Sequence, residues 1–306
     1  MIMKSSLWRG TSIGKAGLDS PSNPLFKNLH FRSILIRLVF IILFLQISLL
    51  TSPICSAQAP TKKIKEFNPG EVKAATVDRL GNFFLVLKNG KVNKYDANGK
   101  RIASLKSKRV DLIEPWFHPS IFVFDRANKK FSRYGRYFEN PIETDIDASW
   151  AIEPYLVSIR ADNHVWILDK ADATLKHINP MTGATVSEIP IDTAQFKTKP
   201  LFTHLREYQN MLFVLDQQSG ILIFSILGKQ IEHIQKKGIQ NFNFVGEELY
   251  YADGNTLKFF DLTTEATREV KVEGTHKFAL VTDERMILID AKNKVTLWEI
   301  PLAPID

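Results

Sequence analysis

The chain has 306 residues, of which 44% are hydrophobic and 24% are charged, a balance that is typical of a globular protein and excludes bulk disorder. A single cysteine excludes a disulfide framework and a cysteine-based zinc cluster. Most of the net charge of +7 lies in residues 1–57, which contain six Lys or Arg and one acidic residue, whereas the rest of the chain has 34 basic and 32 acidic residues. A body with a net charge of +2 gives no support for nucleic-acid binding.

The first 57 residues are expected to be a leader. Residues 1–30 are polar with scattered Gly and Pro, which predicts a flexible stretch. The apolar run over residues 38–50 has the length of a signal-peptide core and is short for a membrane span of about 20 residues. Cys55 and Ala57 supply small residues before Gln58, so we expect cleavage after Ala57. The mature protein would then be periplasmic or associated with the cell envelope, with no membrane span.

Two alternatives for the leader stay open. Residues 34–36 can lengthen the apolar run past Arg37, which would leave an uncleaved membrane anchor. Cys55 can also be a lipidation site, although Ile54 and Ser52 match that pattern poorly.

Residues 58–306 are expected to form one domain, because a short motif repeats six times in them. Each copy has a strand of five mainly apolar residues, a polar turn and a second strand. The apolar strands begin at residues 83, 120, 164, 211, 248 and 285, which lie 37 to 47 residues apart. In five copies an Asp follows the strand: Asp125, Asp169, Asp216, Asp253 and Asp290.

Further extended stretches before and after each pair give four strands per unit of about 40 residues, which predicts an all-β, six-bladed β-propeller. Inner strands should be apolar on both faces, because blades stack on both sides, and the fourth strand should alternate. The last copy lacks a fourth strand, while residues 62–67 (KKIKEF) precede the first copy without a blade. We therefore expect this N-terminal strand to complete the last blade and close the ring.

The segments 78–86 (DRLGNFFLV) and 161–179 (ADNHVWILDKADATLKHIN) resemble six-bladed propellers of the NHL and YVTN-like superfamily. The resemblance implies the fold but not one function, since such propellers include lactonases, lyases, dehydrogenases, receptor modules and scaffolds. The calcium-dependent lactonases have a Glu-Gly-Pro context for a metal-binding Glu. Glu114-Pro115 and Glu153-Pro154 lack this Gly and lie in other blades, so the resemblance assigns no metal site and no cofactor.

No catalytic residue is predicted. The repeated Asp residues are expected to cap their own turns. Among the body histidines, His164 and His177 lie in or beside strands, and His118 and His204 are expected on the opposite side of the ring from His276. A shared histidine site or a nucleophile–base pair is therefore not expected.

A ring of cations is the candidate binding site. The chain approaches four of the six inner strands at Lys73, Arg109, Lys199 and Lys277, which ring geometry places around one channel mouth. Several cations facing one opening would attract an anionic ligand or an acidic protein. The alternative is that they are ordinary solvated charges, balanced by nearby acidic residues.

These observations favour a non-catalytic, extracytoplasmic propeller that acts as a protein- or peptide-binding scaffold in the cell envelope, as a monomer within a larger complex. Its expected partner is an envelope or outer-membrane protein, or an acidic peptide or ligand. The alternative is a propeller enzyme or small-ligand receptor, lactonase- or lyase-like, with its site at the channel mouth.

Overall fold

The computed structural model describes residues 62–106, 109–117 and 119–300. All of them belong to the second of two compact units, Ala57–Asp306. The leader, its cleavage site and His118 lie outside the described residues.

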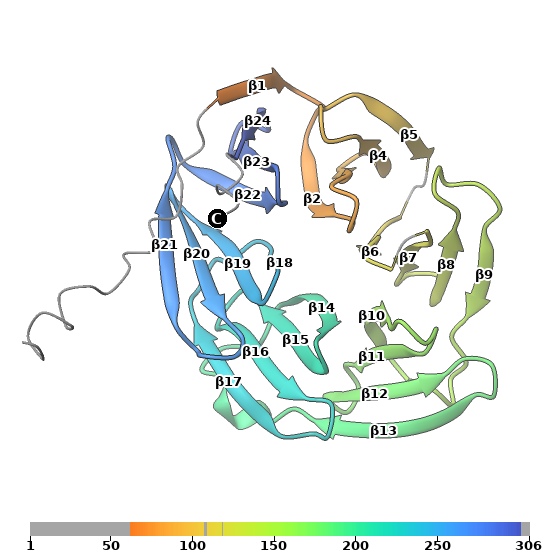
Figure 1. Cartoon of the computed structure of the whole chain (residues 1–306). Helices are drawn as coiled ribbons and strands as arrows, with labels where there is room; N and C mark the ends of the chain where they lie inside the picture. Colours follow the sequence, from red (N-terminus) through yellow and green to blue (C-terminus); the bar gives the residue numbers. More distant parts are fainter. Residues whose placement is uncertain (1–61, 107–108, 118, 301–306) are drawn as a thin grey trace, which may run out of the picture. The chain divides into compact units, whose positions relative to one another are not determined.

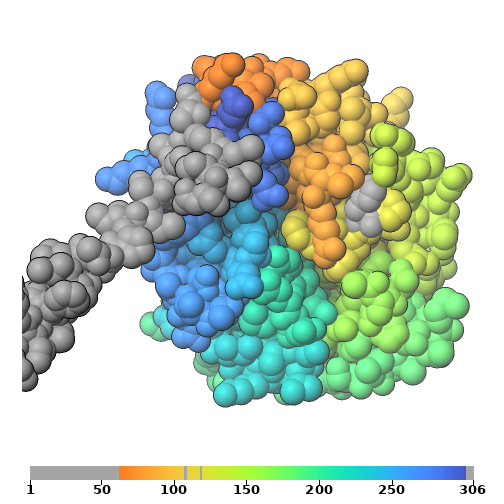
Figure 2. Space-filling view, viewed as in Figure 1, coloured from red at the N-terminus to blue at the C-terminus, as the bar shows by residue number. Residues whose placement is uncertain are grey.

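Six four-stranded antiparallel sheets surround a central axis, which confirms the all-β, six-bladed propeller (Figure 1). The strands of each blade are called A to D, from the axis outwards. On the face that Figure 2 presents, the blades follow one another around the centre in chain order.

The first three blades take their strands in chain order from A to D. Blade 1 contains β2 (Val72–Val77), β3 (Phe83–Leu87), β4 (Lys91–Tyr95) and β5 (Arg101–Lys106). Blade 2 contains β6 (Leu112–Glu114), β7 (Ile121–Asp125), β8 (Lys130–Tyr134) and β9 (Ile142–Asp145). Blade 3 contains β10 (Pro154–Ile159), β11 (Val165–Asp169), β12 (Thr174–Asn179) and β13 (Ala184–Pro190).

The other three blades follow a short 3-10 helix, η1 (Thr193–Gln195). Blade 4 contains β14 (Phe202–Tyr208), β15 (Met211–Asp216), β16 (Gly220–Ser225) and β17 (Gln230–Gln235). Blade 5 contains β18 (Asn243–Val245), β19 (Glu248–Asp253), β20 (Thr256–Asp261) and β21 (Thr267–Lys271). Blade 6 contains β22 (His276–Val281), β23 (Arg285–Asp290), β24 (Val295–Glu299) and, as its outer strand, β1 (Lys62–Phe67).

Strand β1 lies antiparallel to β24, so blade 6 combines the two ends of the described chain. Ile64 and Phe67 of β1 pack on the apolar cluster between blades 6 and 1. Lys65 donates a hydrogen bond of 2.7 Å from Nζ to the carbonyl of Gly99 in blade 1. These contacts cover the edge of β24, which would otherwise present unpaired backbone groups to solvent.

The inner strands are apolar on both faces because alternate residues pack against different neighbouring blades. In β3, Phe83 and Leu85 join a cluster with blade 6, whereas Phe84 and Val86 join a cluster with blade 2. All five β3 residues are buried, while the outer strand β21 alternates between exposed and partly buried positions. The burial expected from the sequence is therefore present.

The blade order defines two faces of the propeller. The A–B face contains the turns from strand A to strand B, and the D–A face contains the connections from each blade to the next. Within the described residues, no helix has the length and apolarity that a membrane-spanning segment needs.

Candidate functional site

A cup of about 480 Å3 opens at the centre of the A–B face. Five of the six blades contribute their A–B turns or the ends of the adjoining strands to its wall. We call it the A–B cup. Its lining residues include Arg79, Leu80, Trp116, Tyr208, Phe244, Asp283 and Glu284.

Aromatic side chains form one side of the A–B cup. The Tyr208 ring stacks on Phe244 at a centroid distance of 4.1 Å, and Trp116 meets Tyr208 edge-on at 5.7 Å. The Arg79 guanidinium lies 5.3 Å from the Trp116 ring centroid. The Tyr208 hydroxyl donates to the carbonyl of Gly246 at 2.5 Å, which fixes the ring. Trp116 therefore lies beside the channel mouth, half-buried between Arg79 of blade 1 and Tyr208 of blade 4.

The A–B cup also has exposed apolar and acidic groups. Leu80 is 58% exposed, and Asp283 and Glu284 are exposed in the A–B turn of the adjacent blade 6. Asp78 is different, because its carboxylate lies 3.5 Å from Lys94 Nζ and accepts hydrogen bonds from the N–H groups of Leu80 and Asn82. Asp78 thus holds its own turn and is not a free acid of the cup.

Below the A–B cup, four buried polar side chains close the channel: Thr76, Glu114, Arg206 and Asn243. We call this cluster the plug. The Arg206 guanidinium binds the Glu114 carboxylate, and it donates hydrogen bonds to Asn243 Oδ1 at 3.0 Å and to Thr76 Oγ1 at 3.1 Å. The backbone N–H of Trp116 donates to the other Glu114 oxygen at 2.9 Å. The four residues come from blades 4, 2, 5 and 1, so the plug ties strands together across the axis.

Register places the plug between the two mouths of the channel. On the A–B side, the lining residues Val77, Trp116, Tyr208 and Phe244 follow the plug residues by one or two positions. On the D–A side, Ala75, Ile113, His204 and Asn241 precede them by one or two positions and line a second cup of about 300 Å3. We call this second hollow the D–A cup. The channel is therefore two cups with a common floor.

Burial sets the ionisation state of His204 in the D–A cup. Desolvation lowers the pKa of His204 to about 3, and the Arg206 guanidinium acts in the same direction. The imidazole is therefore neutral at pH 7. His204 packs edge-on against Phe242 at a centroid distance of 5.4 Å. His276 begins β22 on the same D–A side, so the expectation that His204 and His276 lie on opposite sides of the ring is wrong.

Of the four cations of the predicted ring, Lys73 is the one that lines the D–A cup. Its Nζ donates to the Val110 carbonyl at 2.9 Å and lies 3.9 Å from Asp111. Lys277 donates to the Val72 carbonyl at 3.0 Å and to Asn293 Oδ1 at 2.6 Å, and burial lowers its pKa. Both lysines therefore link one blade to the next.

The other two predicted cations lie apart from the D–A cup. Arg109 precedes β6 and lines an outer hollow with Asp125 and Glu143. Lys199 is exposed in the connection between η1 and β14. All four cations stand at or just before the start of an A strand, but they do not line one pocket.

Four of the five repeated Asp residues hold turns, as the sequence predicts. Asp290 accepts hydrogen bonds from the N–H groups of Lys292 and Lys294, and Asp216 accepts from Gln218. Asp216 also accepts from the Leu201 N–H at 2.7 Å and thereby fixes the approach to β14. Asp125 and Asp169 bind turn N–H groups as well, whereas Asp253 forms an ion pair of 2.8 Å with Lys236.

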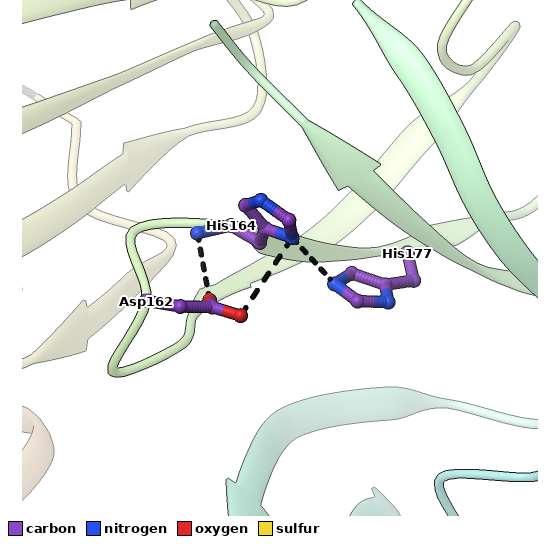
Figure 3. Close-up of side chains that lie close together, drawn as sticks. All are labelled: Asp162, His164 and His177. Carbon is purple, nitrogen blue, oxygen red and sulfur yellow. Dashed lines mark hydrogen bonds and ion pairs between the residues drawn. The ribbon is translucent and has the colours of Figure 1, made fainter.

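A compact group of possible metal ligands lies in blade 3: Asp162, His164 and His177 (Figure 3). His164 Nδ1 is 3.0 Å from His177 Nε2 and 3.7 Å from Asp162 Oδ2. Burial lowers the pKa of His177 to about 4, with contributions from Arg160 and His164, so its ring is neutral at pH 7. The sequence predicts both histidines in or beside strands, but it does not predict that their rings meet.

Sequence reasoning missed the plug as well, although a signal for it exists. Thr76, Glu114, Ser158, Arg206 and Asn243 each stand opposite an aromatic residue at the same register of the A–B strand pair. A polar residue recurring at one position of otherwise apolar inner strands marks a layer that faces the channel. Glu114 lacks the Gly of the metal-binding Glu-Gly-Pro context, and in the structure its carboxylate is paired with the Arg206 guanidinium.

Comparisons with known proteins show the fold. The sequence matches no protein-family model and no curated protein. The WD40 domain of Neurospora crassa Pan2 superposes with a TM-score of 0.53 at 10% identity, over 79% of this chain and 96% of that one. The extracellular domain of the two component system BT4673 from B. thetaiotaomicron superposes with a TM-score of 0.50 at 13% identity, over 76% of this chain. This chain spans about a third (34%) of that protein. At these identities the likeness shows a propeller and nothing more specific.

Proposed function

We propose that residues 58–306 form a non-catalytic binding scaffold that holds a segment of a partner protein in the A–B cup. The observation that carries the proposal is the plug, because it turns the channel mouth into a closed cup beside an aromatic wall. Half-buried aromatic rings beside an exposed leucine are typical of the centre of a protein–protein interface.

The chemistry of the A–B cup indicates the kind of segment that fits. Trp116 and Tyr208 offer apolar ring surface, and Leu80 extends it at the rim. Asp283 and Glu284 line the cup at the A–B turn of blade 6, where Glu284 also lies 3.8 Å from the Arg285 guanidinium, and the two carboxylates favour a cation. We infer a partner segment with an apolar or aromatic side chain next to a Lys or Arg.

The non-catalytic part of the proposal is supported by the partners of the two buried carboxylates, Asp78 and Glu114. Asp78 is paired with Lys94, and Glu114 is paired with Arg206. Paired and buried carboxylates cannot act as a general base at a cup surface without breaking those contacts.

A second surface on the D–A face is proposed for an acidic partner. Lys73 lines the D–A cup, and Arg109, Lys199 and Lys277 lie on the same face. Charges on one face accelerate the association of an anion even when each contributes little to affinity. Replacing all four by Gln should slow association with an acidic partner most strongly at low salt, and an unchanged salt dependence would reject this surface.

We further propose that the scaffold works outside the cytoplasm, in a periplasm or the cell envelope, after removal of the leader. The support is the apolar run over residues 38–50 and the small residues before Gln58. N-terminal sequencing of the exported protein should begin near Gln58. Recovery of the full-length chain from membranes would favour the anchor instead, and a lipid on the new N-terminus would favour Cys55.

One capture experiment compares these surfaces. The purified body is used as bait for envelope extracts of the producing cells, beside three variants of the same length. Leu80→Asp changes the A–B cup, the fourfold Gln variant changes the D–A face, and Leu227→Asp changes a rim leucine that is 92% exposed. The proposal predicts a partner that is lost with Leu80→Asp and retained with Leu227→Asp. A partner retained by both Leu80→Asp and the fourfold variant would contradict binding at either proposed surface.

A further inference from the structure

We propose that Asp162, His164 and His177 bind one divalent transition-metal ion, and that the ion is Zn²⁺. Imidazole nitrogen and carboxylate oxygen are ligand types that zinc prefers. The site goes beyond the proposed binding scaffold, because it lies in blade 3 and uses none of the residues that line the A–B cup.

The geometry is close to that of a bound site. Ligand atoms around a tetrahedral Zn²⁺ lie about 3.3 Å apart, given metal–ligand bonds of about 2.0–2.1 Å. The two imidazole nitrogens are 3.0 Å apart, and Asp162 Oδ2 is 3.7 Å from the nearer of them. The three ligand atoms lie within 4.8 Å of one another, so small side-chain rotations suffice to surround an ion.

Local structure explains why the three side chains converge. Trp166 pairs with His177 across strands β11 and β12, and His164 lies two residues before Trp166. Residues two apart in a strand point to the same side, so His164 stands diagonal to His177. Asp162 lies in the preceding A–B turn, where it accepts a 3.0 Å hydrogen bond from the His164 N–H.

A second layer of contacts holds the His177 ring in place. Trp166 stacks on His177 at a centroid distance of 4.9 Å, and its indole N–H donates to Glu207 Oε2 at 2.5 Å. Such outer contacts keep a ligand oriented before the ion arrives. His164 and Asp162 are more open, with side chains 25% and 47% exposed, so an ion can enter and keep a water ligand.

Arg160 is the charge that opposes metal binding. Its Nε lies 3.3 Å from both Asp162 oxygens, but its guanidinium is also held by the Glu207 carboxylate. The two carboxylates and the one guanidinium together carry a net charge of −1 beside the two imidazole rings. The local charge therefore still favours a cation.

The proposed ion would connect the A–B turn of blade 3 to strand β12. Binding to the folded state alone raises stability with ligand concentration. At 100 times the dissociation constant, Zn²⁺ should raise the thermal midpoint by about 5–10 °C for a domain of this size.

The test uses the tag-free body, first treated with a chelator. Zn²⁺ alone is titrated in competition with a chromogenic chelator, and Co²⁺ alone is added to record its visible absorption. We expect one ion per chain and the visible bands of a tetrahedral Co²⁺ site. His164→Gln and Asp162→Asn should each weaken Zn²⁺ binding at least tenfold, whereas His276→Gln should not change it.

Both ligand variants replace partly exposed side chains, and circular dichroism checks that they fold like the parent. Absence of stoichiometric Zn²⁺ and Co²⁺ binding by the folded parent would overturn the site. Binding that persists unchanged in both folded ligand variants would overturn it as well, because the ion would then lie elsewhere.

Discussion

Removing one partner of the Arg206–Glu114 ion pair should destabilise the propeller far more than removing the charges of both. Each side chain is 1% exposed, so Arg206→Met leaves the Glu114 carboxylate without its cation in a place that water does not reach. Breaking a buried pair in this way costs about 3–5 kcal/mol. For a domain of this size, the thermal midpoint should fall by roughly 6–20 °C.

The matched variant is Glu114→Gln, which keeps an oxygen to accept the Trp116 N–H but removes the negative charge. In the double variant neither charge is left buried, so its loss of stability should be smaller than the sum of the single losses by at least about 2 kcal/mol. Urea denaturation of the four proteins gives the four free energies of unfolding. The reasoning would be refuted if each single variant lost less than about 1 kcal/mol in its free energy of unfolding. It would also be refuted if the loss in the double variant equalled the sum of the two single losses within about 0.5 kcal/mol.

Three further predictions concern the ring and its pH dependence. Deleting residues 58–68 removes β1 and should lower the thermal midpoint strongly, because the edge of β24 becomes exposed. An unchanged midpoint would contradict the role of β1 in closing the ring. Gly220→Ala should destabilise the protein more than Gly238→Ala, although both glycines have a positive φ. A Cβ at Gly220 would lie 1.9 Å from the Ile234 carbonyl oxygen, whereas a Cβ at Gly238 would have no heavy atom within 4 Å. Equal urea midpoints of the two variants would refute the clash. Stability should fall as pH drops from about 6.5 towards 3, because the unfolded state takes up a proton that half-buried His204 does not accept in the folded state. His204→Gln should flatten this part of the pH profile, and an identical profile would show that His204 titrates normally.

The sequence was sufficient to predict the architecture because the propeller repeats one local pattern. Five buried residues in a row, as in β3, are needed wherever a strand packs between two blades, and this need recurs every 37 to 47 residues. A fourth strand is expected in every unit, but in blade 2 the sequence does not locate it, because the four residues IETD of β9 offer no strong alternation. Its position follows only from pairing with β8.

The candidate sites were harder to predict, since they depend on contacts between distant blades. Arg206 and Glu114 are 92 residues apart and meet only when the ring is closed. The start of a strand shows on which face of the propeller a residue lies, but it does not show which way a long side chain such as that of Lys or Arg extends. Lys277 reaches back to Val72 in the next blade, and strand position does not reveal that contact.

The A–B cup is tested most directly by photo-crosslinking in the cells that make the protein. A photoreactive amino acid replaces Leu80 in one variant and Leu227 in another, so that two exposed leucine sites, in the cup and at the rim, are compared. The account predicts a defined protein adduct from position 80, weakened by Trp116→Ala, and none from position 227. No adduct at position 80, or the same adducts at both positions, would contradict a partner segment bound in the cup.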